Sequence, residues 1–245
     1  NGRHWFDDKT SAAALAYVRN SRRDTTNGDV NPDYEEYAEA CEDGFNADGS
    51  PRGSDCGLTR AGGGALHSAV VNTTHMRQQT VGVALSLAKE TDRHVLNAGV
   101  SLDRSRLTYS QFEQPGTFTA DRGAVADPAE PNALFSGVSG NARTFGAYLS
   151  DTWSLTPSTF LTASARWNLA TVSNTLRNSD GSEQPRESFT YRRLNPAVGL
   201  AQKLGGGVTV FGGYAQNNRV PTVLELGCAD PTRPCRLPAG LQADP

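Results

Sequence analysis

The stretch FGAYLSDTWSLTPSTFLTASARWNL, residues 145–169, decides the fold class. Its second half alternates apolar with polar side chains, and a period of two places one kind of chemistry on each face of a β-sheet. Residues 156–158, Thr-Pro-Ser, are turn residues, because proline fixes its own φ and small hydroxyl side chains cap a bend. The stretch therefore predicts a β-hairpin with one polar and one apolar face. The apolar face comprises Phe145, Ala147, Leu149, Trp153 and Leu155, then Leu161, Ala163, Ala165, Trp167 and Leu169.

Such a hairpin is compatible with a sandwich, a soluble barrel or a membrane barrel, and composition narrows this choice in part. The chain has 245 residues, of which 37% are apolar, with a mean hydropathy of −0.50 and a net charge of −3. The low apolar share agrees with one-sided strands and long polar loops. The lack of a basic stripe argues against nucleic acid as a partner. No apolar run reaches the roughly 18–20 residues of a membrane helix, whereas a barrel strand needs only about 9–11 alternating residues.

Five more segments carry strand patterns, and the connections alternate in length. Long connections (26–65, 114–140 and 219–245) and one of medium length (178–187) alternate with short ones (88–93, 156–158 and 205–207). All short turns then fall at one end of an antiparallel sheet, which is typical of an outer-membrane barrel with short periplasmic turns and long extracellular loops. The additional strands are Ser11–Thr25, Leu66–Leu87, one that begins near Leu96, Ser188–Leu204 and Val208–Gln216.

Seven strands are too few for closure, since natural membrane barrels begin at about eight. We therefore expect an all-β fold in which these strands form an arc of a much larger transmembrane barrel. Trp153 lies near the short-turn end and suits an aromatic girdle. Asp151 shares the phase of the apolar face and breaks its pattern. Two locations would accommodate its charge there: the membrane interface or a bulge in the strand. Pro196 predicts a bulge in its strand, because proline cannot donate to a ladder.

The four cysteines form two short-range pairs, both on the long-loop side. Cys41 and Cys56 bracket a segment rich in glycine, aspartate and serine, and Cys228 and Cys235 bracket six residues. Neither spacing is that of a zinc site, so two loop-closing disulfides are the expected state, with four unpaired cysteines as the alternative. Disulfides imply an oxidising compartment such as the periplasm or the cell surface.

Three motifs in the second half add a family resemblance. The hairpin contains Gly146-Ala147-Tyr148, Asp151-Thr152-Trp153 and Arg166-Trp167, and the next strand reads LNPAVGL over residues 194–200. Tyr214 is followed by Arg219-Val220-Pro221-Thr222 and Glu225-Leu226. In this order, over roughly residues 140–245, the motifs resemble the barrel region of TonB-dependent outer-membrane receptors. Asn218 departs from the pattern, because an aromatic residue often precedes the arginine in that family.

The resemblance implies a barrel of about 22 strands around a plug, in the outer membrane of a Gram-negative bacterium, that binds and imports a scarce ligand such as a ferric siderophore. No plug domain or TonB box is present in residues 1–245, so we expect a partial barrel domain whose partners are outer-membrane lipid and the ligand, with TonB engaged only through the plug region. The alternative is a non-transport surface barrel or a soluble all-β binding module with disulfide-closed recognition loops. The motifs imply structural roles for Tyr148, Asp151, Trp153, Pro196, Gly199, Arg219, Pro221 and Glu225.

Candidate site residues come from the polar positions near the long loops. No catalytic motif such as GxSxG or HExxH occurs, so we expect no enzyme, catalytic residue, metal site or cofactor. Arginines at the outer end of a strand could hold an anionic siderophore through charge-assisted hydrogen bonds. The alternatives are that the histidines lie on a solvated upper strand, that the outer arginines form a salt-bridge network at the rim, and that Arg166 belongs to the polar lumen that any large barrel has. Arg219 and Glu225 are expected to form a structural pair at the rim. The candidate ligand contacts are His67, His75, Arg104, Arg106, Tyr109 and Arg166.

Overall fold

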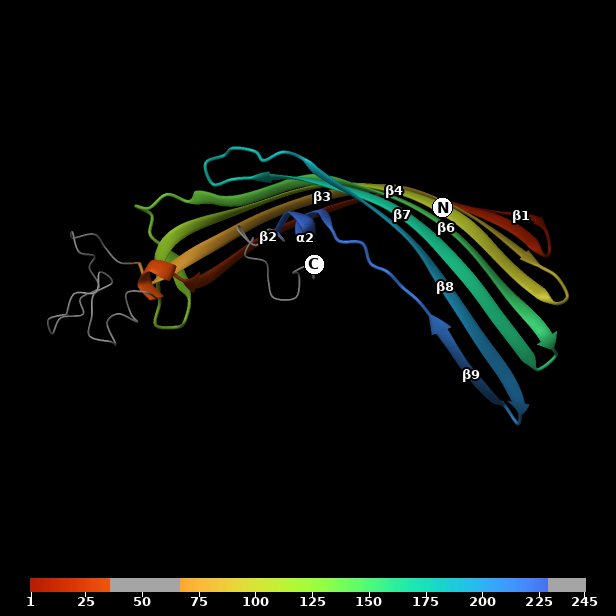
Figure 1. Cartoon of the computed structure of the whole chain (residues 1–245). Coiled ribbons are helices and arrows are strands. Elements are labelled where there is room, and N and C mark those ends of the chain that lie inside the picture. Colours follow the sequence, from red (N-terminus) through yellow and green to blue (C-terminus); the bar gives the residue numbers. More distant parts are fainter. Residues whose placement is uncertain (36–66, 229–245) are drawn as a thin grey trace.

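The computed structural model describes residues 1–35 and 67–228. It contains one curved antiparallel sheet that does not close on itself (Figure 1), with the strand order β1-β2-β3-β4-β6-β7-β8-β9, while β5 pairs with β4. The strands are β1 (Gly2–Asp7), β2 (Thr10–Val30), β3 (Ala69–Glu90), β4 (His94–Phe118), β5 (Ala124–Ala126), β6 (Ala133–Thr156), β7 (Thr159–Arg177), β8 (Glu187–Gly205) and β9 (Val208–Ala215), and a short helix, α2 (Val223–Cys228), follows them.

The seven expected strands are present, which confirms the antiparallel all-β arc, and β1 and β5 add two short ones. Several strands extend further toward the long loops than expected: β2 reaches Val30, β4 reaches Phe118 and β6 already begins at Ala133. The extensions of β2 and β4 are largely polar on both faces, whereas that of β6 begins with Ala133, Leu134 and Phe135, and none of the three alternates apolar with polar residues along its length. They are nevertheless paired residue by residue with the neighbouring strand, which satisfies their backbone groups.

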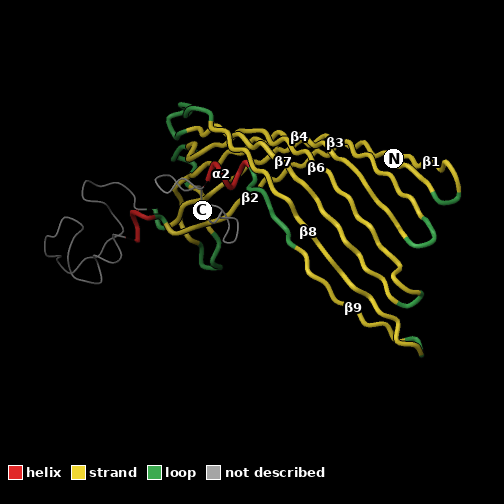
Figure 2. The backbone as a smooth tube through the Cα atoms, turned by 45° about the vertical axis from the view of Figure 1, so that its right-hand side comes forward, coloured by secondary structure: helices red, strands yellow, loops and turns green. Residues whose placement is uncertain are grey.

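The short turns gather at one end of the sheet and the long connections at the other (Figures 1 and 2). Two residues, Pro157 and Ser158, separate β6 from β7, as the sequence predicts. The turn between β8 and β9 uses Gly205, Gly206 and Gly207, whose φ angles are 90°, 59° and 79°. Glycine is the residue that adopts positive φ without steric cost, so this sequence encodes a tight reversal.

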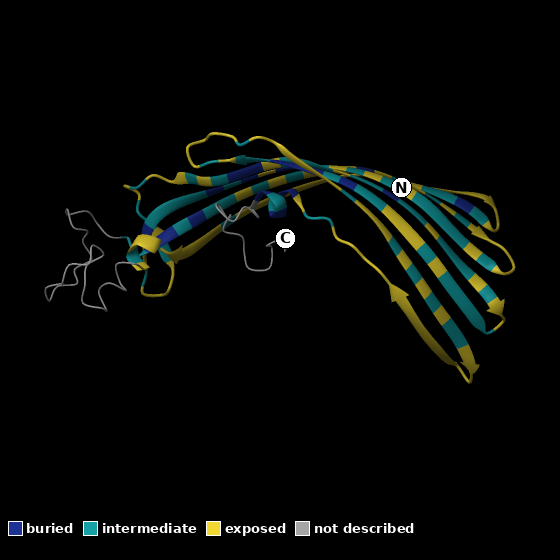
Figure 3. Cartoon of the chain, in the orientation of Figure 1, coloured by how far each residue is buried: buried dark blue, intermediate teal, exposed yellow. Residues whose placement is uncertain are grey.

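The two faces of the sheet differ in chemistry, and the register assigns every strand residue to one of them. Large apolar side chains on one face are well exposed, for example Leu85 at 58%, Leu149 at 57% and Leu194 at 58%. Figure 3 shows the resulting alternation of exposed and half-buried residues along the strands. The opposite face is concave and polar, and α2 lies against it (Figure 1). We call the apolar face the outward face and the concave one the inward face.

Two details differ from the expectations. The bulge at Pro196 is wrong, because β7 and β8 pair without a register shift and Pro196 lies opposite Ala165. The Pro196 carbonyl accepts a hydrogen bond from the Gln216 backbone, so its missing N–H also points toward β9, where the ladder ends after Ala215. The residues after β9 are also not all loop, because Val223–Cys228 form α2.

The predicted disulfides of Cys41 with Cys56 and of Cys228 with Cys235 involve residues outside the described ranges and stay predictions. No helix within residues 1–35 and 67–228 is long and apolar enough to cross a membrane.

Candidate functional site

The candidate site is the inward face of the sheet, where polar side chains from neighbouring strands meet. On β2, Tyr17 donates a hydrogen bond to the Asp103 carboxylate of β4. The strand between them contributes Gly82, where a Cβ atom would lie 2.3 Å from Asp103 Oδ1 and 2.4 Å from Tyr17 Cε1. Glycine at this position is therefore required for the two side chains to meet above β3.

Arg166 provides a positive charge on the same face. Its Nε donates to Asn168 Oδ1 at 2.8 Å and one terminal nitrogen donates to Ser101 Oγ at 3.4 Å. The guanidinium crosses above Gly146, where a Cβ atom would lie 2.5 Å from it. Arg166 is exposed and has no carboxylate partner among the described residues, so it can still bind an anionic group.

A hollow of about 550 Å³ lies beside Arg166. Polar side chains form most of its wall, and one of them, Asn195, has an oxygen that is buried and finds no hydrogen-bond donor within the described part of the chain. A ligand with hydroxyl or amide donors would satisfy this oxygen. The polar wall includes Tyr148, Arg166, Asn168, Asn195, Gln216, Asn217 and Asn218.

The short helix α2 closes the outer part of the inward face. Val223 is 4% exposed and packs in the hydrophobic core of the sheet with Leu107, Tyr109, Val138 and Val172. Tyr109, a candidate ligand contact, is thus a core residue that is 8% exposed. The apolar side chains of this small core are buried because α2 covers them with its own apolar surface.

The start of α2 is a capping box. The Glu225 backbone N–H donates to Thr222 Oγ1 at 3.2 Å, and the Thr222 backbone N–H donates to Glu225 Oε2 at 2.7 Å. Arg219 then donates to both Glu225 oxygens, at 2.7 and 2.9 Å, which confirms the expected pairing of these residues. Burial alone would raise the pKa of Glu225, but the hydrogen bonds from Thr222 and Arg219 outweigh it and hold the pKa below its usual value.

Replacing Glu225 by glutamine should loosen α2. The variant keeps the shape of the side chain but loses the negative charge that Arg219 and the Thr222 N–H bind. We expect the free energy of opening the helix to fall by roughly 1–2 kcal/mol. This figure already allows for solvent screening of the ion pair, because the Arg219 side chain is 69% exposed. The depressed pKa means that this stabilisation is present above the unfolded pKa of about 4.3 and is lost as the pH falls through the folded pKa. Hydrogen exchange of the α2 amides measures both effects.

The matched control for this variant is Glu187→Gln, which removes an exposed carboxylate at the start of β8. Exchange in α2 should remain unchanged in the control. Equal protection of α2 in the Glu225 variant and the parent would show that the carboxylate does not anchor the helix.

The two long loops are joined by a histidine. His67 Nε2 lies 2.9 Å from Asp127 Oδ2, and the histidine side chain is only 11% exposed. The hydrogen bond from His67, together with one from the Ala129 backbone, holds the pKa of Asp127 below its usual value. His67 therefore holds the connection before β3 against the one after β5.

The register places three other candidate residues on the outward face, away from Arg166. Arg104 lies opposite Val81, and Arg106 lies opposite Gln79 two positions further up the strand. His75 pairs with Asp24 at 2.8 Å on the same face. Their phase in the strand, shared with Leu102 and Val83, is the sequence signal that assigns them to this face.

Asp151 also lies on the outward face, and its partner is a residue that the sequence pattern does not reveal. His94 Nδ1 lies 2.8 Å from Asp151 Oδ2, and the His94 ring stacks on Trp153 with centroids 5.7 Å apart. The carboxylate is therefore paired near the short-turn end, where Trp153 suits the expected girdle.

Comparisons with known proteins agree with this architecture. The model of the family "TonB dependent receptor-like, beta-barrel" matches residues 1–238. No curated protein matches. Among solved structures, the chain is similar to the ferric yersiniabactin uptake receptor FyuA from Yersinia pestis, with a TM-score of 0.55, 12% identity and coverage of 84% of this chain and 25% of that one.

A second similar structure is the ferric-catecholate import receptor Fiu from E. coli K12. Its open form has a TM-score of 0.58 and 13% identity, with coverage of 89% of this chain and 34% of Fiu, and its closed form has a TM-score of 0.55 and 13% identity, with coverage of 87% and 31%. The chain thus spans a quarter to a third of the length of these receptors. The family match over nearly all residues, and the shared fold, show that this chain belongs to the TonB-dependent receptor-like β-barrel family.

Proposed function

We propose that this chain is part of an outer-membrane receptor of a Gram-negative bacterium that binds and imports a scarce ligand, with a ferric siderophore as the leading ligand class. The observation that carries the proposal is the division of the sheet into an apolar outward face and a polar inward face, on which Arg166 has no carboxylate partner within residues 1–35 and 67–228. An apolar band against lipid and a polar lumen are what a transport barrel requires. The solved structures similar to it are named for ferric yersiniabactin uptake and ferric-catecholate import.

In this function the barrel contacts outer-membrane lipid through its outward face, and the ligand through its inward face and long loops. Passage of the ligand needs no covalent chemistry, so the protein acts as a transporter and not as an enzyme. Coupling to TonB would run through the plug region of the receptor. The alternative, a surface barrel without transport, would bind a ligand and show no uptake.

The primary test is ligand uptake by a strain that lacks the full-length gene, grown under iron limitation. The probes are radiolabelled ferric yersiniabactin and a radiolabelled ferric catecholate, which represent the two named ligand classes. Loss of uptake of one probe, restored by the gene on a plasmid, supports the proposal. Unchanged uptake of both probes, in a strain without other receptors for them, contradicts the siderophore assignment.

Within this function we expect Arg166 to contact the ligand. Replacing it by glutamine should lower uptake or binding of an anionic ferric complex by about tenfold to a hundredfold, because a hydrogen bond to a charged group contributes about 1.5–3 kcal/mol. The matched control is Arg104→Gln, which removes the same charge from the outward face. A loss of uptake in the control but not in the Arg166 variant would reverse the assignment of the two arginines.

A further inference from the structure

Six arginines lie on the outward face just beyond the apolar band. They come from five strands, and all of them are exposed. The register places them on the same face as the apolar side chains of the band, because Arg104 lies opposite Val81 and Arg192 lies opposite Leu169. We call this set the arginine row: Arg22 of β2, Arg77 of β3, Arg104 and Arg106 of β4, Arg143 of β6 and Arg192 of β8.

The arginine row follows the edge of the apolar band from strand to strand. In β4 the last apolar outward residue is Leu102 and the first arginine comes two positions later; the same interval separates Phe145 from Arg143 in β6. In β2 and β3 the interval is four positions. With about 3.4 Å per residue and a strand tilt near 40°, the guanidinium groups begin roughly 5–10 Å beyond the band. This depth is that of the headgroup layer of a bilayer.

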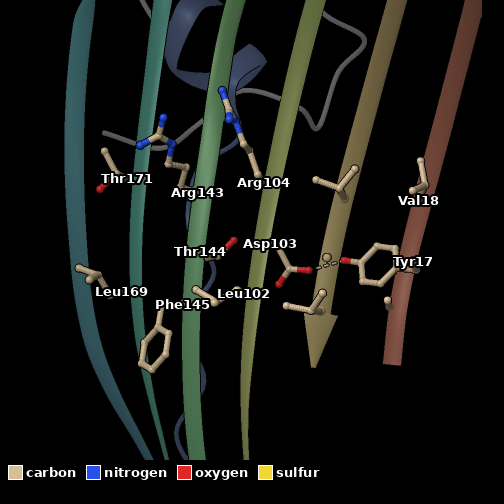
Figure 4. Close-up of a pocket in the computed structure, with 14 residues that line it drawn as sticks. Tyr17, Val18, Leu102, Asp103, Arg104, Arg143, Thr144, Phe145, Leu169 and Thr171 are labelled. Atoms are coloured by element: carbon tan, nitrogen blue, oxygen red, sulfur yellow. Dashed lines mark hydrogen bonds between the residues drawn. The ribbon is translucent and has the colours of Figure 1, made fainter. Parts of the chain in front are cut away.

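Two pairs of arginines face each other directly across neighbouring strands. Arg22 lies opposite Arg77, and Arg104 lies opposite Arg143. Figure 4 shows Arg104 and Arg143 next to each other, with Leu102 and Phe145 below them in a hollow of the structure. Like charges directly opposite each other destabilise a sheet, so an anion between them would convert a repulsion into an attraction.

The outward face offers these arginines little negative charge. On the described strands beyond the apolar band, Asp24 is the one carboxylate of this face, and it binds Arg22 at 2.8 Å and His75 at 2.8 Å. Among the residues that the structure describes, Arg77, Arg104, Arg106, Arg143 and Arg192 have no salt bridge. The row therefore carries an uncompensated positive charge in line with the bilayer surface.

We propose that the arginine row binds the phosphate groups of anionic lipids in the outer leaflet of the membrane around the barrel. This lipid-binding role rests on the proposed function, since it presupposes that lipid lies against the outward face. Arginine suits this role, because its planar guanidinium binds a phosphate through two parallel hydrogen bonds. The apolar residues directly below the row would contact the acyl chains of the same lipid molecule.

The test uses the full-length protein, purified in a nonionic detergent and examined by native mass spectrometry with lipid A that carries two phosphates. The variant is Arg104→Gln with Arg143→Gln. Each arginine near an anionic surface contributes a factor of about five in affinity, so the double variant should bind lipid A roughly 25-fold more weakly. The matched control is Arg193→Gln, which neighbours Arg192 but lies on the inward face, and it should bind as the parent does.

Three comparisons make the result decisive. Dephosphorylated lipid A should bind weakly to the parent, and free inorganic phosphate should not displace the phosphorylated lipid, because the site binds a headgroup and its acyl chains together. Without lipid, the double variant should unfold at the same or a higher temperature than the parent, since a repulsive pair has been removed. Equal binding of lipid A by parent and double variant, or an equal loss in the Arg193 control, overturns the proposal.

The two proposals fail in different ways. If the full-length protein does not fractionate with the outer membrane and lacks heat-modifiable migration in gels, the proposed function fails and the lipid site with it. If it behaves as an outer-membrane barrel and the double variant retains lipid A, only the lipid site is overturned.

Discussion

Replacement of Leu149 by arginine should prevent stable insertion of the barrel. Leu149 lies in the apolar band of β6, opposite Ala98 and Ala165, and 57% of it is exposed on the outward face. A charged side chain at the bilayer midplane costs about 2–4 kcal/mol in a membrane barrel. We expect the free energy of folding into phosphatidylcholine vesicles to fall by this amount, as measured by denaturant titration of the full-length protein.

The neighbouring residue provides the control. Ser150 belongs to the same strand but lies on the inward face, opposite Asn97 and Ser164. Ser150→Arg adds the same charge to a polar surface and should change the folding free energy by less than about 1 kcal/mol. If the two variants were equally stable in vesicles, or if the Ser150 variant were the weaker one, the assignment of the outward face to lipid would be wrong.

The pair of variants tests the part of the structure that the sequence predicted best. Alternation along residues 145–169 requires only local information, since each strand residue must choose one of two faces. Loop lengths then placed the short turns at one end. The outer extensions of β2, β4 and β6 escaped prediction because they lie beyond the apolar band, do not alternate apolar with polar residues and are held by pairing with a neighbouring strand.

The contacts of single residues were predictable only where the sequence keeps the partners close. Arg219 and Glu225 are six positions apart and were expected to pair, and Thr222 three positions before Glu225 is a capping signal for α2 that sequence reasoning missed. Asp151 is different, because its partner His94 lies 57 positions earlier. Only the register of β4 against β6 brings them together, and the alternation pattern contains no information about that register.

Replacement of Gly140 by alanine should detach α2 from the sheet. A Cβ atom on Gly140 would lie 2.1 Å from the Ser173 carbonyl oxygen and 2.5 Å from Val223 Cγ1, and the first of these contacts involves backbone that cannot move without breaking the β6–β7 ladder. Overpacking of this kind costs about 1–3 kcal/mol. The contact with Ser173 should loosen the β6–β7 ladder locally, and since α2 is a helix of only six residues, the contact with Val223 should be relieved by its release. Hydrogen exchange of the α2 amides and proteolysis after Arg219 should then both accelerate.

Two further substitutions separate release of α2 from general loss of stability. Gly212→Val in β9 is the control, because a Cβ atom there would meet nothing within 4 Å, and α2 should remain protected. Gly227→Ala places a methyl group 2.6 Å from Val138 Cγ1, so it should also release α2, whereas combining it with Val138→Ala should restore protection. Rescue by the smaller side chain is expected only if α2 packs directly on β6, since a helix held solely by the bond between Arg219 and Glu225 would not respond to the size of residue 138. Unchanged exchange in Gly140→Ala would contradict this packing.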